Sequence, residues 1–145
     1  MTFLLDVNVL IALIDPAHIS HDTAHQWFEK LGNQSWATCP ITENGVTRIV
    51  GHASYPNSAG SPADVAEIVA QMRELPGHVF WSDSISLIEA SHVDESQIRT
   101  PAQVTDTYLL ALAQANNGTL ATFDRRLSVK AVKRGNQALH IISPT

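Results

Sequence analysis

Five short runs of apolar residues constrain the fold of this sequence more than any other feature. They are Thr2–Leu5, Trp36–Cys39, His78–Trp81, Thr119–Thr122 and Leu139–Ile142. Continuous apolar runs of about four to eight residues are typical of strands that are buried on both faces of a parallel sheet. Segments with helical character separate these runs. The sequence therefore predicts an α/β fold, with helices packed around a mostly parallel sheet.

The expected helices follow from apolar spacing and capping residues. Ser20–Leu31 places apolar residues at i, i+3, i+4 and i+7. Ser61 is a favourable N-cap, and Pro62 suits the first helical position. The full set of predicted helices is Val7–Ile14, Ser20–Leu31, Thr42–Val50, Ser61 to about Leu75, Ser84–Ala90, Thr100 to about Asn116, and Arg125 to just before Gly135. The loop Gly51–Gly60 is the segment we expect to be mobile.

Length and composition narrow the class of protein. A chain of 145 residues predicts a single domain over residues 1–145. With 44% hydrophobic and 16% charged residues, the chain is not intrinsically disordered. Cys39 is the one cysteine, which excludes an internal disulfide and a cysteine-based zinc site. No apolar stretch approaches the roughly 20 residues of a membrane span, so we expect a protein of the cytoplasm with no membrane partner.

Four carboxylates lie where an α/β sheet presents its functional groups. Asp6 directly follows the first predicted strand, and Asp124 follows the fourth. Glu43 comes just after the second strand, and Asp106 lies in the first turns of the helix before the fourth. Ligands of open α/β sheets bind outside the carboxyl ends of the strands. These four side chains are therefore expected to converge at one edge of the sheet.

Each acid also has a purely structural explanation. Asp6 and Asp124 could cap helices, and Glu43 and Asp106 could complement helix dipoles in a first turn. Four carboxylates in one pocket would raise one another's pKa values, and a divalent cation would remove that cost. Mg²⁺ and Mn²⁺ prefer such oxygen ligands. Two of these ions, about 3.5–4 Å apart, can activate water against a phosphodiester.

Five motifs, in order along the chain, resemble those of PIN-domain proteins, and in particular the VapC-type ribonuclease toxins of toxin–antitoxin pairs. LLDVNVLIAL is similar to the first strand and helix of the family, with Asp6 and Asn8 as its D-x-N. HDTAHQWFEKL resembles its H-x-x-A-x-x-W helix, and ITENGVTRIV carries the second acid, Glu43. TDTYLLALA resembles the third acidic motif through Asp106, and TFDRRL resembles the T-x-D motif.

The resemblance implies a three-layer α/β/α fold with about five strands and an endoribonuclease that depends on Mg²⁺ or Mn²⁺, with one or two ions per site. Asp6, Glu43, Asp106 and Asp124 would be the catalytic, metal-binding acids. Asn8 and Thr122 would orient the pocket through hydrogen bonds. It also implies an RNA substrate, a homodimer, a bacterial cytoplasmic location and inhibition by a cognate VapB-type antitoxin protein.

The charge distribution is compatible with RNA. The formal net charge is −5, and the four predicted site acids contribute most of it. Five cations lie close together after Asp124: Arg125, Arg126, Lys130, Lys133 and Arg134. A helix would place the last four of them on one face beside the site. We predict that they contact the phosphate backbone, with an ordinary solvated helix face as the alternative. Arg48 would contact phosphate or pair with a site acid.

Other interpretations stay open at this point. The domain could be a non-catalytic PIN-like binding module that uses its acids to dock a basic peptide. A magnesium-dependent phosphohydrolase of the haloacid dehalogenase type is less favoured, because it would need a D-x-D motif and Asn8 occupies the second position. His18, His21 and His25 could share a zinc ion, although packing or capping explains them better. Tyr55 could stack on a base.

Overall fold

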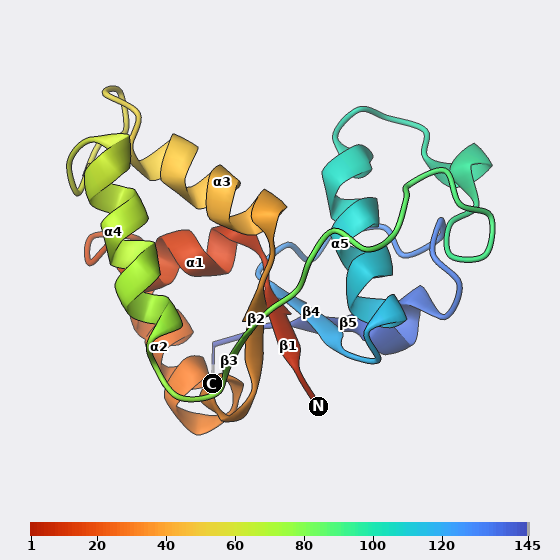
Figure 1. Ribbon diagram of the computed structural model, residues 1–145, viewed down its shortest axis with the longest axis horizontal. Helices are drawn as coiled ribbons and strands as arrows, with labels where there is room; N and C mark the ends of the chain where they lie inside the picture. Colours follow the sequence, from red (N-terminus) through yellow and green to blue (C-terminus); the bar gives the residue numbers. More distant parts are fainter. Residues whose placement is uncertain (145) are drawn as a thin grey trace.

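The computed structural model describes residues 1–144, so residue 145 of the expected domain lies outside it. Five parallel strands form one sheet in the order β3-β2-β1-β4-β5 (Figure 1). The strands are β1 (Phe3–Leu5), β2 (Trp36–Thr38), β3 (His78–Phe80), β4 (Thr119–Thr122) and β5 (Leu139–Ile141). Each of the five predicted strands is confirmed, with bounds that differ by a residue at one end at most.

The sheet is flanked by α1 (Val7–Ile14), α2 (His21–Lys30), α3 (Pro40–Val50), α4 (Pro62–Arg73) and α5 (Gln103–Ala115). Three short 3₁₀ turns are η1 (Gly32–Gln34), η2 (Glu95–Gln97) and η3 (Gly135–Ala138). Ser61 caps α4 as expected, since its hydroxyl accepts the Asp64 N–H. α3 begins at Pro40, earlier than predicted, because the Thr42 hydroxyl accepts the Cys39 N–H and closes the first turn.

Alternation along β1 explains the layers. Leu4 belongs to the core between the sheet and α5. Phe3 and Leu5 belong to the opposite core, which α1, α3 and α4 complete through residues such as Val9, Val46 and Val65. Successive side chains of a strand point to opposite faces, so both faces of this strand are buried. Figure 1 accordingly shows α1–α4 on one side of the sheet and α5 on the other, which confirms the predicted three layers.

The predicted helix Ser84–Ala90 is absent. The residues of this segment that pack on the core are Ile85 and Leu87, two positions apart. That spacing suits an extended chain, since a helix would place these side chains on different faces. Serine and β-branched residues also lower helix propensity here. The apolar content of this segment predicts a helix, but the two side chains that pack on the core do not follow a 3.6-residue period.

The predicted helix from Arg125 is also wrong. Residues 125–134 form turns, and Val132 pairs with Val93 in an isolated antiparallel bridge. A side chain here competes with helical hydrogen bonding for a backbone N–H group, since Asp124 Oδ1 accepts the Arg126 N–H at 2.9 Å. Arg134 has a left-handed backbone with φ of 56°, which ends any helical path. The four cations therefore do not share a helical face.

Residues near the C-terminal end of α1 fix the neighbouring loops. His21 Nδ1 and His25 Nε2 lie 2.7 and 2.9 Å from the carbonyl oxygens of Ala12 and Leu13. These contacts cap the last turn of α1, which agrees with a packing or capping role for the two histidines. Among the described residues, no histidine cluster is suited to hold a metal ion. Tyr55 donates its hydroxyl to Asp15 at 2.5 Å, so its polar end is already engaged. Among the described residues, no helix is long and apolar enough to cross a membrane.

Candidate functional site

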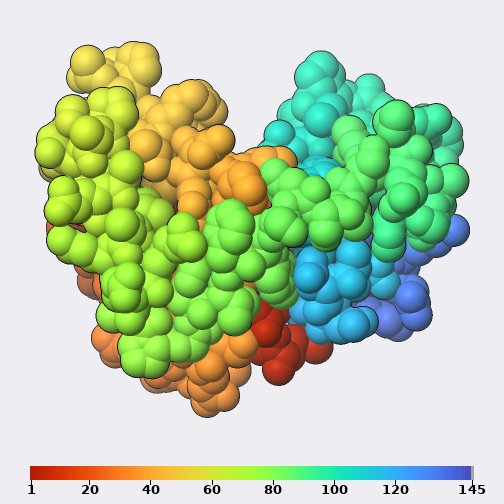
Figure 2. Space-filling model, in the orientation of Figure 1, coloured from red at the N-terminus to blue at the C-terminus, as the bar shows by residue number. Residues whose placement is uncertain are grey.

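A groove of about 1040 Å³ opens between α3, α4 and the N-terminal end of α5, at the carboxyl edge of the sheet. Figure 2 shows the molecule hollowed between the part that carries α3 and α4 and the part that carries α5. Its charged lining residues are Asp6, Glu43, Arg48, Arg73 and Asp106. The walls on α3 and α4 are otherwise small or apolar, for example Gly45, Ala66 and Ala70. The groove is therefore open to solvent and carries both acidic and basic side chains.

Asp6 lies where β1 runs directly into α1. Its Oδ1 accepts the Val7 N–H at 2.7 Å, which makes it the N-cap of α1. Its Oδ2 accepts the Thr122 hydroxyl at 2.8 Å. The side chain is only 6% exposed. The structural and the functional explanation of Asp6 are thus compatible, because capping fixes the carboxylate at the edge of the groove.

Thr122 connects both ends of the sequence at this site. Its hydroxyl donates to Asp6 and accepts the Asn8 side-chain amide at 3.0 Å and the Asp124 N–H at 3.1 Å. One donated and two accepted bonds exhaust what a hydroxyl can make. Asn8 in turn accepts the Phe123 N–H at 3.2 Å. The two residues expected to orient the pocket therefore contact each other, and Thr122 also contacts the Asp6 carboxylate and the Asp124 backbone.

The negative charges of Asp6 and Asp124 affect the ionisation of Asp106, and that of Asp124 affects the ionisation of Asp6. Burial, followed by the charges of Asp6 and Asp124, raises the pKa of Asp106 to about 6. Burial also raises the pKa of Asp6, opposed by its bonds from Thr122 and Val7, while Asp124 raises it further. Within residues 1–144 no cation forms an ion pair with any of the three. These aspartates therefore lie near enough for their charges to interact, although they do not form a compact ligand cluster.

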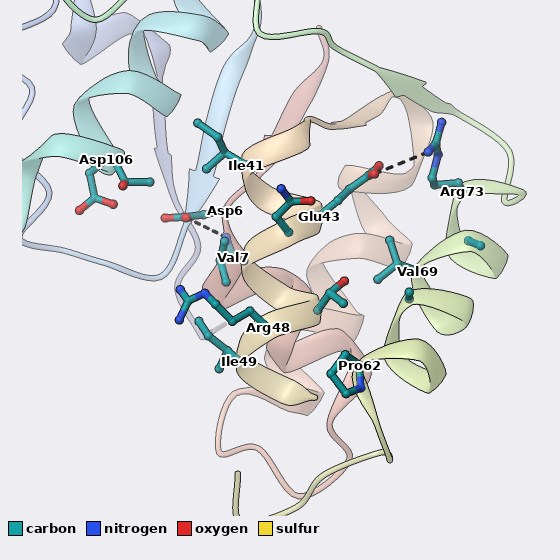
Figure 3. A pocket seen from close by; sticks show the side chains of 16 residues that line it. Asp6, Val7, Ile41, Glu43, Arg48, Ile49, Pro62, Val69, Arg73 and Asp106 are labelled. Carbon is teal, nitrogen blue, oxygen red and sulfur yellow. Dashed lines mark hydrogen bonds and ion pairs between the residues drawn. The ribbon is translucent and has the colours of Figure 1, made fainter. Parts of the chain in front are cut away.

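Glu43 does not join that group. Its Oε2 accepts the Thr38 hydroxyl at 2.6 Å, and its Oε1 lies 3.6 Å from a guanidinium nitrogen of Arg73. Figure 3 shows this side chain directed toward Arg73, whereas Asp6 and Asp106 lie on the other side of α3. The convergence of all four predicted acids is therefore not observed. The cause is that α4 presents a cation to Glu43 from the far wall of the groove.

The network around Glu43 includes three residues that the sequence analysis missed. Thr38 ends β2, His78 begins β3 and Arg73 ends α4. His78 Nε2 lies 2.8 Å from the Thr38 hydroxyl oxygen, and burial followed by the nearby Arg73 charge lowers the pKa of His78. Arg73 is indistinguishable in sequence from a last-turn cation that complements a helix dipole. Of these three residues, only Thr38 could have been predicted from the sequence, because it is a polar residue at the carboxyl end of a buried strand.

The donor chemistry fits a divalent metal ion. The three aspartates supply only oxygen ligands, and their mutual repulsion would be relieved by a hard cation such as Mg²⁺ or Mn²⁺. As arranged here, no three acidic, histidine or cysteine side chains of the described chain are grouped closely enough to hold an ion. Metal binding would therefore draw the carboxylates closer together. Asp6, Asp106 and Asp124 are the nearest candidates, and Glu43 could join only by leaving a present partner.

The predicted RNA-contacting cations divide into separate places. Arg48 lines the groove. Arg125, Arg126 and Lys130 are exposed on the turns that follow Asp124. Lys133 and Arg134 line another pocket with His92, at the C-terminal end of α5. The expected continuous strip beside the site is therefore absent.

The fold and the acidic site together define a known class of protein. The family model described as "PIN domain" matches residues 3–133. A crystal structure of VapC20 from Mycobacterium tuberculosis, described as a sarcin–ricin loop cleaving toxin, superposes with a TM-score of 0.65. That match covers 90% of this chain and 96% of VapC20, at 13% identity, and so concerns the fold alone. The chain belongs to the PIN-domain family.

Closer relatives place the chain among the VapC proteins of that family. Ribonuclease VapC44 of Mycobacterium tuberculosis is 40% identical over 132 residues, which cover 91% of this chain and 92% of the relative. Ribonuclease VapC39 of the same species is 44% identical over 131 residues, covering 90% and 94%. The resemblance drawn from the five sequence motifs is thereby confirmed.

Proposed function

We propose that this protein is a VapC-type endoribonuclease toxin that hydrolyses RNA phosphodiester bonds at the Asp6–Asp106–Asp124 site. The observation that carries the proposal is the pair Asp6 and Asp106 in an open groove, with no ion-paired cation among the described residues and with Asp124 near enough to affect the ionisation of both. Relatives at 40–44% identity over most of the chain bear the name ribonuclease, which supports the same conclusion.

Each residue of the site would have its own role in metal binding, orientation or substrate contact. Bound Mg²⁺ or Mn²⁺, as one or two ions, would supply an activated water and stabilise the leaving oxygen. Asp6, Asp106 and Asp124 would bind the metal, and Glu43 would complete the set. Thr122 and Asn8 would keep the Asp6 carboxylate in one orientation through their hydrogen bonds. Arg48, which lines the groove, would contact a phosphate of the substrate.

We further propose the biological setting that applies to such toxins. The substrate is RNA, the inhibitor is a cognate VapB-type antitoxin protein, the protein is a homodimer, and it acts in the bacterial cytoplasm. The exposed cations Arg125, Arg126, Lys130, Lys133 and Arg134 remain candidates for backbone contacts. Because they lie in more than one place, each group needs its own test.

The decisive experiment compares cleavage by the parent protein and by Asp6→Asn. Purified protein, freed of antitoxin, is incubated with total bacterial RNA in Mg²⁺, Mn²⁺ or EDTA. We expect discrete products with metal only, and none from Asp6→Asn, because the amide removes a charged ligand while keeping the shape of the N-cap. Asp22→Asn is the matched control, since Asp22 is an exposed acid on α2 outside the groove.

Equal cleavage by Asp6→Asn and the parent would refute the metal site. No cleavage by any variant, combined with no metal binding in calorimetry, would favour the non-catalytic PIN-like binding module. The ion pair between Glu43 and Arg73 is the observation that suits that alternative. A phosphohydrolase of the dehalogenase type does not fit this chain, because the chain belongs to another family and Asn8 replaces the second acid of its motif.

A further inference from the structure

Both carboxylate oxygens of Glu43 already have partners. Oε2 accepts the Thr38 hydroxyl at 2.6 Å, and Oε1 faces the Arg73 guanidinium at 3.6 Å. The Glu43 side chain is 19% exposed, so these partners replace most of its solvent. In Figure 3 the carboxylate extends outward from α3 toward Arg73 and away from Asp6. A metal ion at the aspartates could use Glu43 only if one of these contacts gave way.

The Thr38 contact is rigid. Thr38 is 1% exposed and lies on an inner strand of the sheet. Its single hydroxyl proton is donated to Glu43, so the His78 Nε2 that lies 2.8 Å from the same oxygen must carry hydrogen and donate to it. Strand pairing between β2 and β3 places Thr38 near His78. This hydrogen-bonded chain leaves Glu43 Oε2 little freedom.

The Arg73 contact is the one that can open. The Arg73 side chain is 42% exposed and ends the helix α4. Its guanidinium carbon lies 4.9 Å from the centroid of the Phe80 ring, a contact that the side chain makes in addition to the ion pair and that does not depend on Glu43. Ion pairs this exposed contribute little to stability, on the order of 1 kcal/mol or less. A divalent cation could therefore displace Arg73 at low cost.

We propose that Arg73 is a positioning residue that holds Glu43 on the α4 side of the groove as a resident counter-ion, which a metal ion must displace to recruit this carboxylate. The inference rests on the proposed function, because it assumes a metal at the aspartates. It separates the four acids into two classes. The three aspartates have no ion-pair partner among the described residues, whereas Glu43 must first leave Arg73 before it can reach the metal ion.

The test is a thermodynamic cycle on Mn²⁺ affinity, measured by titration calorimetry on the full chain. Arg73→Ala should tighten Mn²⁺ binding about three- to fivefold, on the scale of a partly exposed ion pair. In the Glu43→Gln background the same change should lose most of that gain, because the carboxylate that Arg73 restrains is gone. Arg73→Lys, which keeps the cation, should stay close to the parent. Thermal unfolding confirms that each variant folds.

Arg48→Ala is the matched control. Arg48 lines the same groove and carries the same charge, but within the described chain it forms no ion pair. Its removal should change Mn²⁺ affinity equally with Glu43 and with Glu43→Gln. If Arg73→Ala behaves in that additive way, weakens binding or has no effect, the inference is overturned while the proposed function stands. If no variant, the parent included, binds Mn²⁺, the metal site itself fails and this inference falls with it.

Discussion

At the scale of single residues, one hydroxyl does most to organise the site. Thr122 is fully buried and bonds to Asp6, Asn8 and the Asp124 backbone. Removing it would leave two donors and one carboxylate oxygen without their partner in a buried place. Such groups cost more when unpaired than their bonds contribute when made.

Thr122→Val should therefore lower the free energy of unfolding by about 1–3 kcal/mol, measured by urea denaturation. Thr119→Val is the control on the same strand: Thr119 is also buried, but its hydroxyl contacts only the Met1 sulfur, a weak acceptor. An effect of Thr122→Val no larger than that of Thr119→Val would show that the network is not strongly coupled.

Asp106 gives the metal-free protein a distinctive pH dependence. Its pKa is about 6 in the folded protein and 3.8 in the reference state, so folding favours its protonated form. The contribution to stability is complete below pH 3.8 and is lost as the pH rises through about 6. Asp106→Asn removes this loss. At pH 7 without metal, we expect the variant to be more stable by about 1 kcal/mol, a value reduced for solvent screening.

Chemical denaturation of Asp106→Asn and the parent across this pH range checks the sign. The advantage of the variant should grow as the pH rises from 3.8 to about 6 and then level off. A constant difference over the range would mean that the pKa of Asp106 is not raised in the folded protein. Saturating Mg²⁺ should abolish the advantage, since the parent then has a counter-charge that the amide cannot match.

At the scale of elements, α1 is fixed at both ends. Asp6 caps its start, and His21 and His25 contact carbonyl oxygens of its last turn. Asp15 follows directly and accepts hydrogen bonds from Tyr55 and Asn57 of the loop that we expected to be mobile. These bonds lower the pKa of Asp15. The loop is thus attached to the same helix that presents Asp6.

Tyr55→Phe should detach part of that loop. It removes a charge-assisted bond of 2.5 Å, while Asn57 still serves the carboxylate, so we expect a loss of about 1 kcal/mol. Hydrogen exchange should accelerate for amides of residues 52–58. His52→Ala is the control in this loop, because the His52 ring bonds only to Ser54 there. Unchanged exchange in Tyr55→Phe would mean that other contacts fix the loop.

At the scale of the whole molecule, the strand order creates the site. β1 and β4 are central neighbours, and the chain proceeds from them in opposite directions across the sheet. This is a topological switch point, where α/β sheets bind their ligands. Asp6 after β1 and Asp124 after β4 thereby become neighbours. α5, on the opposite face, brings Asp106 to the same edge.

Metal should stabilise the molecule as a whole if this edge is a metal site. At a concentration of about 100 times the dissociation constant, a ligand that binds only the folded state adds roughly 2.7 kcal/mol. For a chain of this size that corresponds to a rise in Tm of at least about 5 °C. We expect Mn²⁺ to produce this rise in the parent and not in Asp6→Asn. Equal rises in both would point to binding elsewhere on an acidic protein.

The sequence alone determined the five strands and most helices, and it predicted acids at the carboxyl ends of the strands. These follow from local rules: apolar runs for buried strands, capping residues for helix ends, and a polar residue where a strand stops. Segments 84–90 and 125–134 escaped those rules, because long-range packing of Ile85 and Leu87 and the bridge between Val93 and Val132 decided their course.

Only the tertiary structure decided which carboxylates face one another and which is held apart. Asp6, Asp106 and Asp124 come near enough for their charges to interact because sheet order and helix placement bring three distant segments to one edge. Glu43 is separated from them by Arg73, which lies 30 positions further along the chain and reaches it only because α3 packs against α4. Residue type and spacing encode what a side chain can do. Its partner depends on the packing of elements, which no local pattern specifies.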